Sequence, residues 1–401
     1  MTAFLIRRLF QMAVVVFLAS IVTYAILNAA PGGPADFLVP REAQQGGARG
    51  VTEEDIQRIK ARFELDLNTP VRFMRWFAGV PAGPLNIGGN QFFGDIEVGC
   101  AKPGLVRLRY ADGTEEIVEE GCAQPVRLAD LEGRKVSRGV LLGDFGPSWT
   151  MLRDRPISQL LESRLPYTLQ LMGVSIFLSI VIGVPIGVYS AVRQYSRFDY
   201  AMTTTAFLGS SLPSFFIGIM LILVFAILAK QAGLPYLPSG NATAARDYVV
   251  PLLGRVEAES GLDRLLHFIM PCFVLVFGSV AGWSRFVRAS MLEVLRSDYV
   301  RTARAKGVRE NIVITKHALR NALIPFITLL AGVLPGIFAG AIITESIFNW
   351  PGMGRLYVDA LSRFDYPVAM AVTYITIILT MLGYLLSDIL YSVVDPRIRL
   401  N

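Results

Sequence analysis

Few residues in this chain have the types and spacing that catalysis or metal binding requires. The only histidines are His267 and His317, and neither belongs to the HExxH pair that holds zinc on a helix. The chain has no GxxxxGK[ST] phosphate-binding loop, so we do not expect it to hydrolyse ATP. Both histidines stand near the ends of apolar segments, which leaves none in mid-segment to activate a serine for intramembrane hydrolysis. We predict no catalytic, metal-binding or cofactor-binding residues.

Two of the three cysteines, Cys100 and Cys122, flank a segment that we predict to be a β-hairpin. Residues 106–110 alternate apolar and basic side chains, residues 111–113 are a turn signal, and residues 115–120 continue as a polar strand. A piece of this size buries little apolar surface, so a staple is expected. A disulfide across the loop would contribute about 3 kcal/mol in the chain-entropy model. The alternative is two unpaired small residues.

The most specific pattern is a basic, amphipathic stretch from Asp298 to Pro325. Ser297 or Asp298 can cap the start of a helix, and Gly307 stands where a left-handed helix cap needs no side chain. A second helix is predicted from near Asn311 toward Pro325, where the chain turns into the next apolar segment. We expect the two helices to form an elbow, and we use that name for residues 298–325.

Basic residues dominate the region around the elbow. Between residues 284 and 322, nine Arg or Lys stand against three Asp or Glu. Such an excess marks a loop on the cytoplasmic face of a membrane. The simpler alternative is a basic loop that lies on anionic headgroups and has no protein partner.

The composition indicates a membrane protein, in which the segments on either side of this loop lie in a bilayer. Hydrophobic residues make up 53% of the chain and the mean hydropathy is +0.48, which is too apolar for a soluble protein of this length. Crossing a bilayer takes about 20 apolar residues in a helix. Six segments meet or approach that length: Leu9 to Ala30, Tyr167 to Val192, Ala201 to Ala229, Leu265 to Ser284, Leu323 to Thr344 and Val368 to Val393.

The basic residues of the short connections predict the orientation. With the N-terminus inside, fifteen Arg or Lys fall on the inner side and six in the short outer loops, so both termini are predicted to be cytoplasmic. The net charge of +6 is then a topology signal rather than a nucleic-acid footprint. The first apolar segment exceeds the roughly 7 to 15 residues of a signal-peptide core, so we expect a retained span.

The sequence of the elbow is similar to that of a known family. RTARAKG followed by HALRNALIP closely resembles the cytoplasmic coupling loop of bacterial ABC importer permeases, in the dipeptide/oligopeptide branch. The general importer motif begins with Glu-Ala-Ala where this chain has Arg301, Thr302 and Ala303, a departure typical of the peptide branch. The opening FLIRRLFQMAVVVFLASIVTYAILNAAPGGPAD, the stretch TESIFNWPGMG at residues 344–354 and DPRIR at residues 395–399 also resemble these permeases.

The resemblance implies an all-α permease subunit with six transmembrane helices. It also implies a second homologous permease, two cytoplasmic ATPase subunits that use ATP and magnesium, and an extracytoplasmic solute-binding protein, with no cofactor bound by this chain. The cargo expected is peptides, although related permeases carry nickel chelates, glutathione or oligosaccharides. The residues expected to couple this chain to an ATPase are Tyr299, Thr302, Ala303, Arg304, Ala305, Lys306, Gly307, Leu319 and Pro325.

The long connection between the first two spans divides the chain into three regions. We predict a cytoplasmic N-terminus and first span at residues 1–30, an extracytoplasmic region at 31–165, and a five-helix core at 166–401 that contains the loop 284–322. Residues 52–65 have the pattern of a capped amphipathic helix. Residues 62–79 and 143–149 resemble neighbouring pieces of the family's first outer loop, so residues 80–142, with the hairpin, are interpreted as an insertion.

An ion-coupled secondary transporter is the remaining alternative class. It would need charged groups near the bilayer midplane. Glu345 and Asp388 are the acidic residues closest to that condition, but they fall near the ends of the fifth and sixth predicted spans. We therefore expect both carboxylates to be solvated or capped rather than to relay protons.

Overall fold

The computed structural model describes residues 2–29, 53–87, 90–109, 115–134, 137–152, 155–333, 336 and 341–394. The chain divides into two compact units. The helical unit comprises Met1–Val14, Leu161–Asp359 and Ile375–Asn401, and the mixed unit comprises Val15–Leu160 and Ala360–Tyr374.

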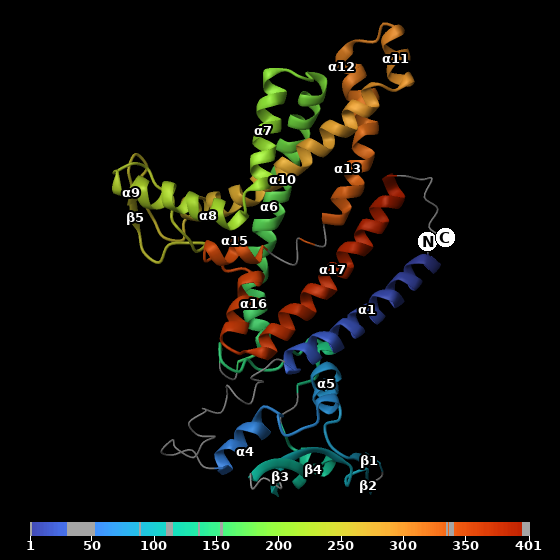
Figure 1. The fold of residues 1–401 in the computed structure, drawn as a ribbon, viewed down its shortest axis with the longest axis vertical. Coiled ribbons are helices and arrows are strands. Elements are labelled where there is room, and N and C mark those ends of the chain that lie inside the picture. Colours follow the sequence, from blue (N-terminus) through green and yellow to red (C-terminus); the bar gives the residue numbers. More distant parts are fainter. Residues whose placement is uncertain are drawn as a thin grey trace. The chain divides into compact units, whose positions relative to one another are not determined.

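Helices make up most of the structure (Figure 1), and α1 and α17 contribute residues to both units. In chain order they are α1 (Thr2–Ala29), α6 (Ile157–Val192), α7 (Arg197–Ser211), α8 (Ser214–Leu221), α9 (Ala229–Gln231), α10 (Gly261–Leu295), α11 (Asp298–Ala305), α12 (Glu310–Ile312), α13 (Arg320–Val333), α15 (Ile342–Ile347), α16 (Met353–Ser362) and α17 (Tyr366–Val394). Two π-helical turns, η3 (Ile222–Leu228) and η4 (Val313–Leu319), continue α8 and α12. A short hairpin of β5 (Tyr248–Val250) and β6 (Gly254–Val256) precedes α10.

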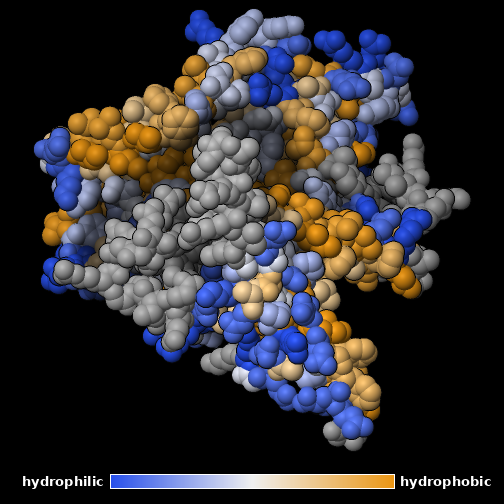
Figure 2. All heavy atoms as spheres, turned by 60° about the horizontal axis from the view of Figure 1, so that its bottom comes forward, coloured by the Kyte–Doolittle hydropathy of each residue, from blue (hydrophilic) through white to orange (hydrophobic). Residues whose placement is uncertain are grey.

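Within the described residues, five helices are long and apolar enough to cross a bilayer: Ile6–Ala29, Ile157–Val192, Ser214–Gln231, Gly261–Leu295 and Tyr366–Ile389. Figure 2 shows many of their apolar side chains at the surface, which a lipid environment accommodates. The predicted fifth span begins in α13, but much of it lies outside the described residues. A count of six spans therefore stays a prediction.

The predicted third span, residues 201–229, is wrong as a single helix. The chain breaks at Leu212 and Pro213, and α8 leaves α7 at a steep angle (Figure 1). Proline has no N–H to donate and disfavours a helical residue before it, so it starts α8 instead of continuing α7. Hydropathy does not register this break because both sides of it are apolar.

An apolar cluster joins four helical segments near the elbow. Its buried members are Ala191, Trp283, Val287, Met291, Val300, Ala303, Val313, Ala318, Ala322 and Phe326. The rings of Trp283 and Phe326 meet edge to face, with centroids 5.8 Å apart. The cluster thus ties α6, α10, α11 and the helix that starts with α12 into one body.

The mixed unit contains the predicted hairpin. Strands β3 (Glu97–Arg109) and β4 (Glu115–Arg127) pair antiparallel, and Val106 faces Val118. This confirms the hairpin, although its turn lies outside the described residues. The structure joins Cys100 and Cys122 by a disulfide, with Cα atoms 5.9 Å apart.

Smaller elements complete the mixed unit. They are α4 (Glu53–Arg62), which fits the helix predicted there, α5 (Thr69–Ala78), the ribbon of β1 (Leu85–Ile87) and β2 (Asn90–Phe92), and the 3₁₀ turns η1 (Leu128–Leu131) and η2 (Val140–Leu142). Buried Leu67, Val98, Val126, Leu128 and Leu131 form its small core. The β1–β2 ribbon was not predicted, because three-residue strands leave no readable alternation.

The two ends of the insertion, residues 80–142, lie close together. Gly79 and Gly139 are in backbone contact: a Cβ on Gly79 would lie 2.7 Å from the Arg138 carbonyl oxygen, and one on Gly139 would lie 2.6 Å from the Ala78 carbonyl carbon. The flanking pieces also meet, since the rings of Phe63 and Trp149 lie 5.0 Å apart. Two sequence stretches separated by about sixty residues therefore fold together around the base of the insertion.

Candidate functional site

The turn of the elbow is closed by backbone hydrogen bonds. The N–H of Gly307 donates to the Arg304 carbonyl at 3.0 Å, and the N–H of Val308 donates to the Ala303 carbonyl at 3.3 Å. This pair of bonds is a Schellman motif. Gly307 has φ +74°, a left-handed conformation that costs other residues energy. The predicted glycine cap is confirmed.

The start of α11 differs from the prediction in one detail. Ser297 is the N-cap residue, but its side chain accepts no hydrogen bond from the helix. Its hydroxyl donates instead to the Val294 carbonyl at 2.6 Å. Asp298 lies in the first turn, where a negative side chain interacts favourably with the positive end of the helix dipole.

The helix α11 has two chemically different faces. Val300 and Ala303 are buried in the apolar cluster, whereas Tyr299, Thr302 and Ala305 are exposed. Ala303 therefore holds α11 onto this chain's own helices and offers no surface to a partner. The other residues predicted for coupling stay accessible, apart from half-buried Leu319: Arg304, Lys306, Gly307 and Pro325.

An ion pair spans the turn, which the sequence analysis did not predict. Arg304 donates from Nη2 to Glu310 Oε1 at 2.7 Å and from Nε to Oε2 at 3.2 Å. The hydrogen bond from Arg304 lowers the pKa of Glu310, and the same bond raises the pKa of Arg304. Opposite charges on either side of a predicted glycine turn were the signal for this pair.

The second helix of the elbow is longer than predicted. It starts at Glu310, widens into η4 and continues as α13 through Pro325 to Val333. The prediction that the helix ends near Pro325 was wrong. Ala322 and Phe326 are buried on either side of the proline, so apolar packing keeps the helix continuous despite the missing N–H.

A hydrogen-bonded ion pair joins α10, the helix that leads into the elbow, to α7. On α10, Arg288 donates two hydrogen bonds to Asp199 of α7, at 2.7 and 2.8 Å. Asp199 is buried and also accepts from the Tyr195 N–H at 2.9 Å. A paired, planar Arg–carboxylate contact holds geometry well, so α10 and α7 position the elbow together.

A buried carboxylate organises the stretch at residues 344–354. Glu345 is fully buried and accepts hydrogen bonds from the Thr168 hydroxyl at 2.9 Å and the Arg355 N–H at 3.0 Å. The Thr168 oxygen accepts in turn from the Met353 N–H at 2.7 Å, and the Trp350 indole donates to the Tyr167 carbonyl at 3.1 Å. Glu345 is capped as expected, but it is not solvated.

A second buried carboxylate holds a turn in the mixed unit. Asp365 accepts from the Ser148 hydroxyl at 2.5 Å and from the N–H groups of Trp149, Thr150 and Met151 at 3.1, 2.9 and 2.9 Å. These donors belong to and follow the GDFGPSW stretch. That stretch is therefore shaped by a carboxylate more than two hundred residues away in sequence.

Asp388, the other acid near the end of a predicted span, also has a partner. Asp388 on α17 accepts from Arg8 on α1, with Nε and Nη2 at 2.6 and 2.5 Å from Oδ2. This arrangement suits a link between helices and gives no support to proton relay.

Comparison with known proteins places this architecture in a family. Residues 183–400 match the family described as binding-protein-dependent transport system inner membrane component, and residues 1–100 match the N-terminal part of such components. An oligopeptide transport system permease protein of Bacillus subtilis is 41% identical over 294 residues, 73% of this chain and 87% of that protein.

Further relatives are permeases for related small cargoes. A dipeptide transport system permease protein of Escherichia coli is 38% identical over 276 residues, covering 65% of this chain and 78% of that protein. A glutathione transport system permease protein of Pectobacterium atrosepticum is 37% identical over 260 residues, covering 65% and 76%. Among solved structures, an inward-facing methionine ABC transporter is 17% identical with a TM-score of 0.45, covering 59% of this chain and 97% of that chain.

These matches identify the class of protein as a multi-pass permease of the bacterial inner membrane. The chain belongs to the family of binding-protein-dependent transport system inner membrane components, the membrane subunits of ABC importers.

Proposed function

We propose that this permease forms half of the translocation path for di- or oligopeptides and that its elbow receives the mechanical stroke of an ATPase subunit. The supporting observation is the elbow itself. It presents Tyr299, Thr302 and Ala305 on an exposed face, while its opposite face is fixed in the apolar cluster. Peptide cargo is supported by the relatives from Bacillus subtilis and Escherichia coli, which are oligopeptide and dipeptide transport system permeases.

Two connections transmit movement of α11 to the spans in this proposal. Val300 and Ala303 transmit it to α10 through the cluster. The Schellman turn and the Arg304–Glu310 pair transmit it to α12 and onward along the continuous helix to α13. Packed interiors yield little, so the elbow is expected to move as one body with the inner ends of both helices.

The proposed assembly contains a second homologous permease, two cytoplasmic ATPases that use ATP and magnesium, and an external solute-binding protein. Both termini of this chain are placed in the cytoplasm, from the distribution of Arg and Lys. Nickel chelates, glutathione and oligosaccharides are the alternative cargoes. Glutathione has specific support from the Pectobacterium relative.

The insertion is proposed to contact the binding protein from the outer side. Leu85 pairs with Phe92 across the β1–β2 ribbon, and cross-strand partners share a face with residues two positions along the strand. Leu85, Ile87 and Phe92 therefore form one apolar face, and they are 52%, 59% and 45% exposed. An apolar face left uncovered in this way is typical of a contact surface.

Crosslinking tests the elbow assignment. Cysteine at Thr302 or Ala305 is expected to crosslink to an ATPase subunit in the assembled complex, even at high salt, because a docked helix does not depend on screened headgroup attraction. Ala303→Cys is the matched control, since its side chain faces inward. Equal crosslinking at Ala303 and Thr302, or crosslinking of Thr302 to lipid alone, would refute the assignment.

Uptake tests the cargo and the energy source. Proteoliposomes containing the full complex are expected to accumulate a labelled dipeptide when ATP is supplied, and to stop when the ATPases are inhibited. Uptake that follows an ion gradient without ATP would favour secondary transport. Uptake of glutathione but not of the dipeptide would leave the mechanism standing and change the cargo.

A further inference from the structure

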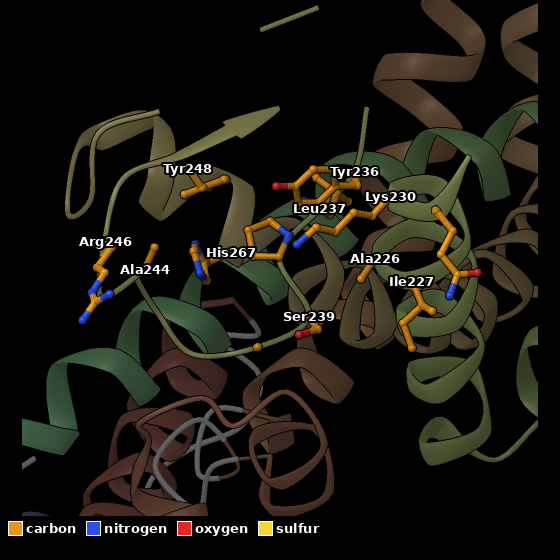
Figure 3. Close-up of a pocket in the computed structure, with 13 residues that line it drawn as sticks. Ala226, Ile227, Lys230, Tyr236, Leu237, Ser239, Ala244, Arg246, Tyr248 and His267 are labelled. Carbon is orange, nitrogen blue, oxygen red and sulfur yellow. The ribbon is translucent and has the colours of Figure 1, made fainter. Parts of the chain in front are cut away.

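A cavity of about 600 Å³ opens beside the end of α9, where the loop before the β5–β6 hairpin folds over α10 (Figure 3). Lys230 comes from α9, Tyr236 and Arg246 from the loop, Tyr248 from β5 and His267 from α10. The volume lies in the range of small-molecule sites. The sequence motifs and the proposed function leave this cavity without a role.

Two acids among the described residues near the cavity, Asp247 and Asp263, are already satisfied. Asp247 accepts from Arg255 Nη2 at 2.7 Å and from the Ala258 N–H at 2.9 Å. Asp263 is fully buried and accepts hydrogen bonds from the N–H groups of Ala244 and Glu259 at 2.9 and 3.0 Å and from the Tyr248 hydroxyl at 3.0 Å. His267 Nδ1 lies 3.0 Å from the same carboxylate. Burial, and then the bond to Asp263, raise the pKa of Tyr248, so its hydroxyl remains a donor.

The cations at the cavity lack such satisfaction. Within the described part of the chain, neither Lys230 nor Arg246 has an acidic partner, and both are exposed. The Lys230 ammonium lies 5.1 Å from the centre of the Tyr236 ring, and the Tyr236 hydroxyl is fixed by donating to the Val249 carbonyl at 3.0 Å. The cavity therefore has a net positive charge and a preformed aromatic wall.

One side of the cavity continues onto a membrane helix. Ala226 and Ile227 of η3 line it, and Leu223, Val224 and Leu228 on the same turn are exposed. This segment belongs to the apolar run Ser214–Gln231, which is long enough to cross a bilayer. A ligand bound by the cations thus has beside it the apolar surface of a candidate membrane span.

We propose that this cavity binds the headgroup of an anionic phospholipid. Lys230 and Arg246, which lie on different sides of the cavity (Figure 3), attract the anionic headgroup, while the acyl chains lie along Leu223, Val224 and Ile227. Free phosphate shares the charge chemistry, but it makes no use of the apolar side. A zwitterionic lipid shares the apolar part, but its headgroup carries no net charge for the two cations.

Native mass spectrometry of the purified whole complex tests the site, with phosphatidylglycerol and phosphatidylcholine as probes. Wild-type complex is expected to retain phosphatidylglycerol preferentially. Lys230→Gln together with Arg246→Gln should weaken that retention about 30-fold, since each basic residue near a phosphate contributes about tenfold or less. Lys230→Gln alone is compared with Arg264→Gln, the control that removes one exposed charge from the same region outside the cavity.

Two further arms separate the lipid from a soluble anion. Ile227→Asn should weaken phosphatidylglycerol retention, and millimolar inorganic phosphate should not displace the lipid. Competition by inorganic phosphate, with Ile227→Asn unchanged, would overturn the proposal in favour of a free-anion site. Equal loss in Arg264→Gln and Lys230→Gln, or no preference in wild type, would overturn it as well.

Discussion

The elbow and the stretch around Glu345 both connect long helices, but they are held in opposite ways. The elbow combines backbone hydrogen bonds, one buried apolar face and an exposed ion pair. The Glu345 stretch depends on one fully buried carboxylate with donors on both sides. Distributed contacts tolerate the loss of a single group, whereas a buried carboxylate leaves orphaned donors when it is removed. The region proposed to move is thus the tolerant one.

Glu345→Ala should have the largest effect. It leaves the Thr168 hydroxyl and the Arg355 N–H buried without an acceptor, at about 1–3 kcal/mol each. Thermal unfolding can be followed by maleimide labelling of Cys272, a buried free thiol that becomes reactive on opening. Glu293→Ala, at an exposed glutamate of α10, is the control. If both variants unfold at the wild-type temperature, Glu345 does not organise the stretch.

Loss of the disulfide should come next, and its effect should stay local. Replacing both Cys100 and Cys122 by Ser is expected to destabilise the β3–β4 hairpin by about 3 kcal/mol and to leave the elbow unaffected. Limited proteolysis of residues 97–127 measures the first effect and transport measures the second. Non-reducing peptide mapping of the wild type must also show the linked pair, and free alkylatable thiols at both positions would refute it.

Gly307→Val should act on coupling more than on stability. A Cβ at Gly307 meets no atom within 4 Å, so the cost is the left-handed backbone alone, about 1–2 kcal/mol. We expect the variant to reach the membrane but to transport less per ATP hydrolysed. Gly307→Asn, which tolerates this conformation, should stay near wild type. Wild-type uptake in the valine variant would count against the elbow as the coupling element.

Arg304→Gln should have the smallest effect. Both partners of the Arg304–Glu310 pair are substantially exposed, so we expect less than about 1 kcal/mol. Because the folded state lowers the pKa of Glu310, the pair stabilises the turn at neutral pH and loses that contribution as the carboxylate protonates in acid. Hydrogen exchange at Gly307 and Val308 should therefore speed up on acidification relative to the intrinsic rate in wild type, and change less in Arg304→Gln.

Local rules explain which features could be predicted. The Gly307 cap depends on one residue and its neighbours, and the hairpin depends on alternation and a turn signal, so both were predicted correctly. The contacts of Glu345 and Asp365 join residues 177 and 217 positions apart, and no local pattern encodes such partners. Helix ends were also mispredicted at two prolines. At Pro325 apolar packing keeps the helix continuous. At Pro213 the helix breaks inside an apolar run that hydropathy shows as one segment.

The inward face of α11 shows the same division. The amphipathic pattern predicted a helix with two faces, but the sequence did not indicate which face belongs to the protein's own interior. Val300 and Ala303 belong to the same buried cluster as Val287 and Met291 of α10, and that packing depends on how two helices meet around the Ser297 bend. Ala303 was therefore predicted as a coupling residue, whereas in the structure its side chain is buried in the apolar cluster of this chain.

The pair between Arg8 and Asp388 has a consequence for how the protein is made. Arg8 lies on α1 and Asp388 on α17, so their bond can form only after the chain between these helices has been synthesised. Until then each of the two polar side chains must be solvated by water, headgroups or the insertion machinery. A nascent chain that stalls before α17 therefore lacks this contact between its helices.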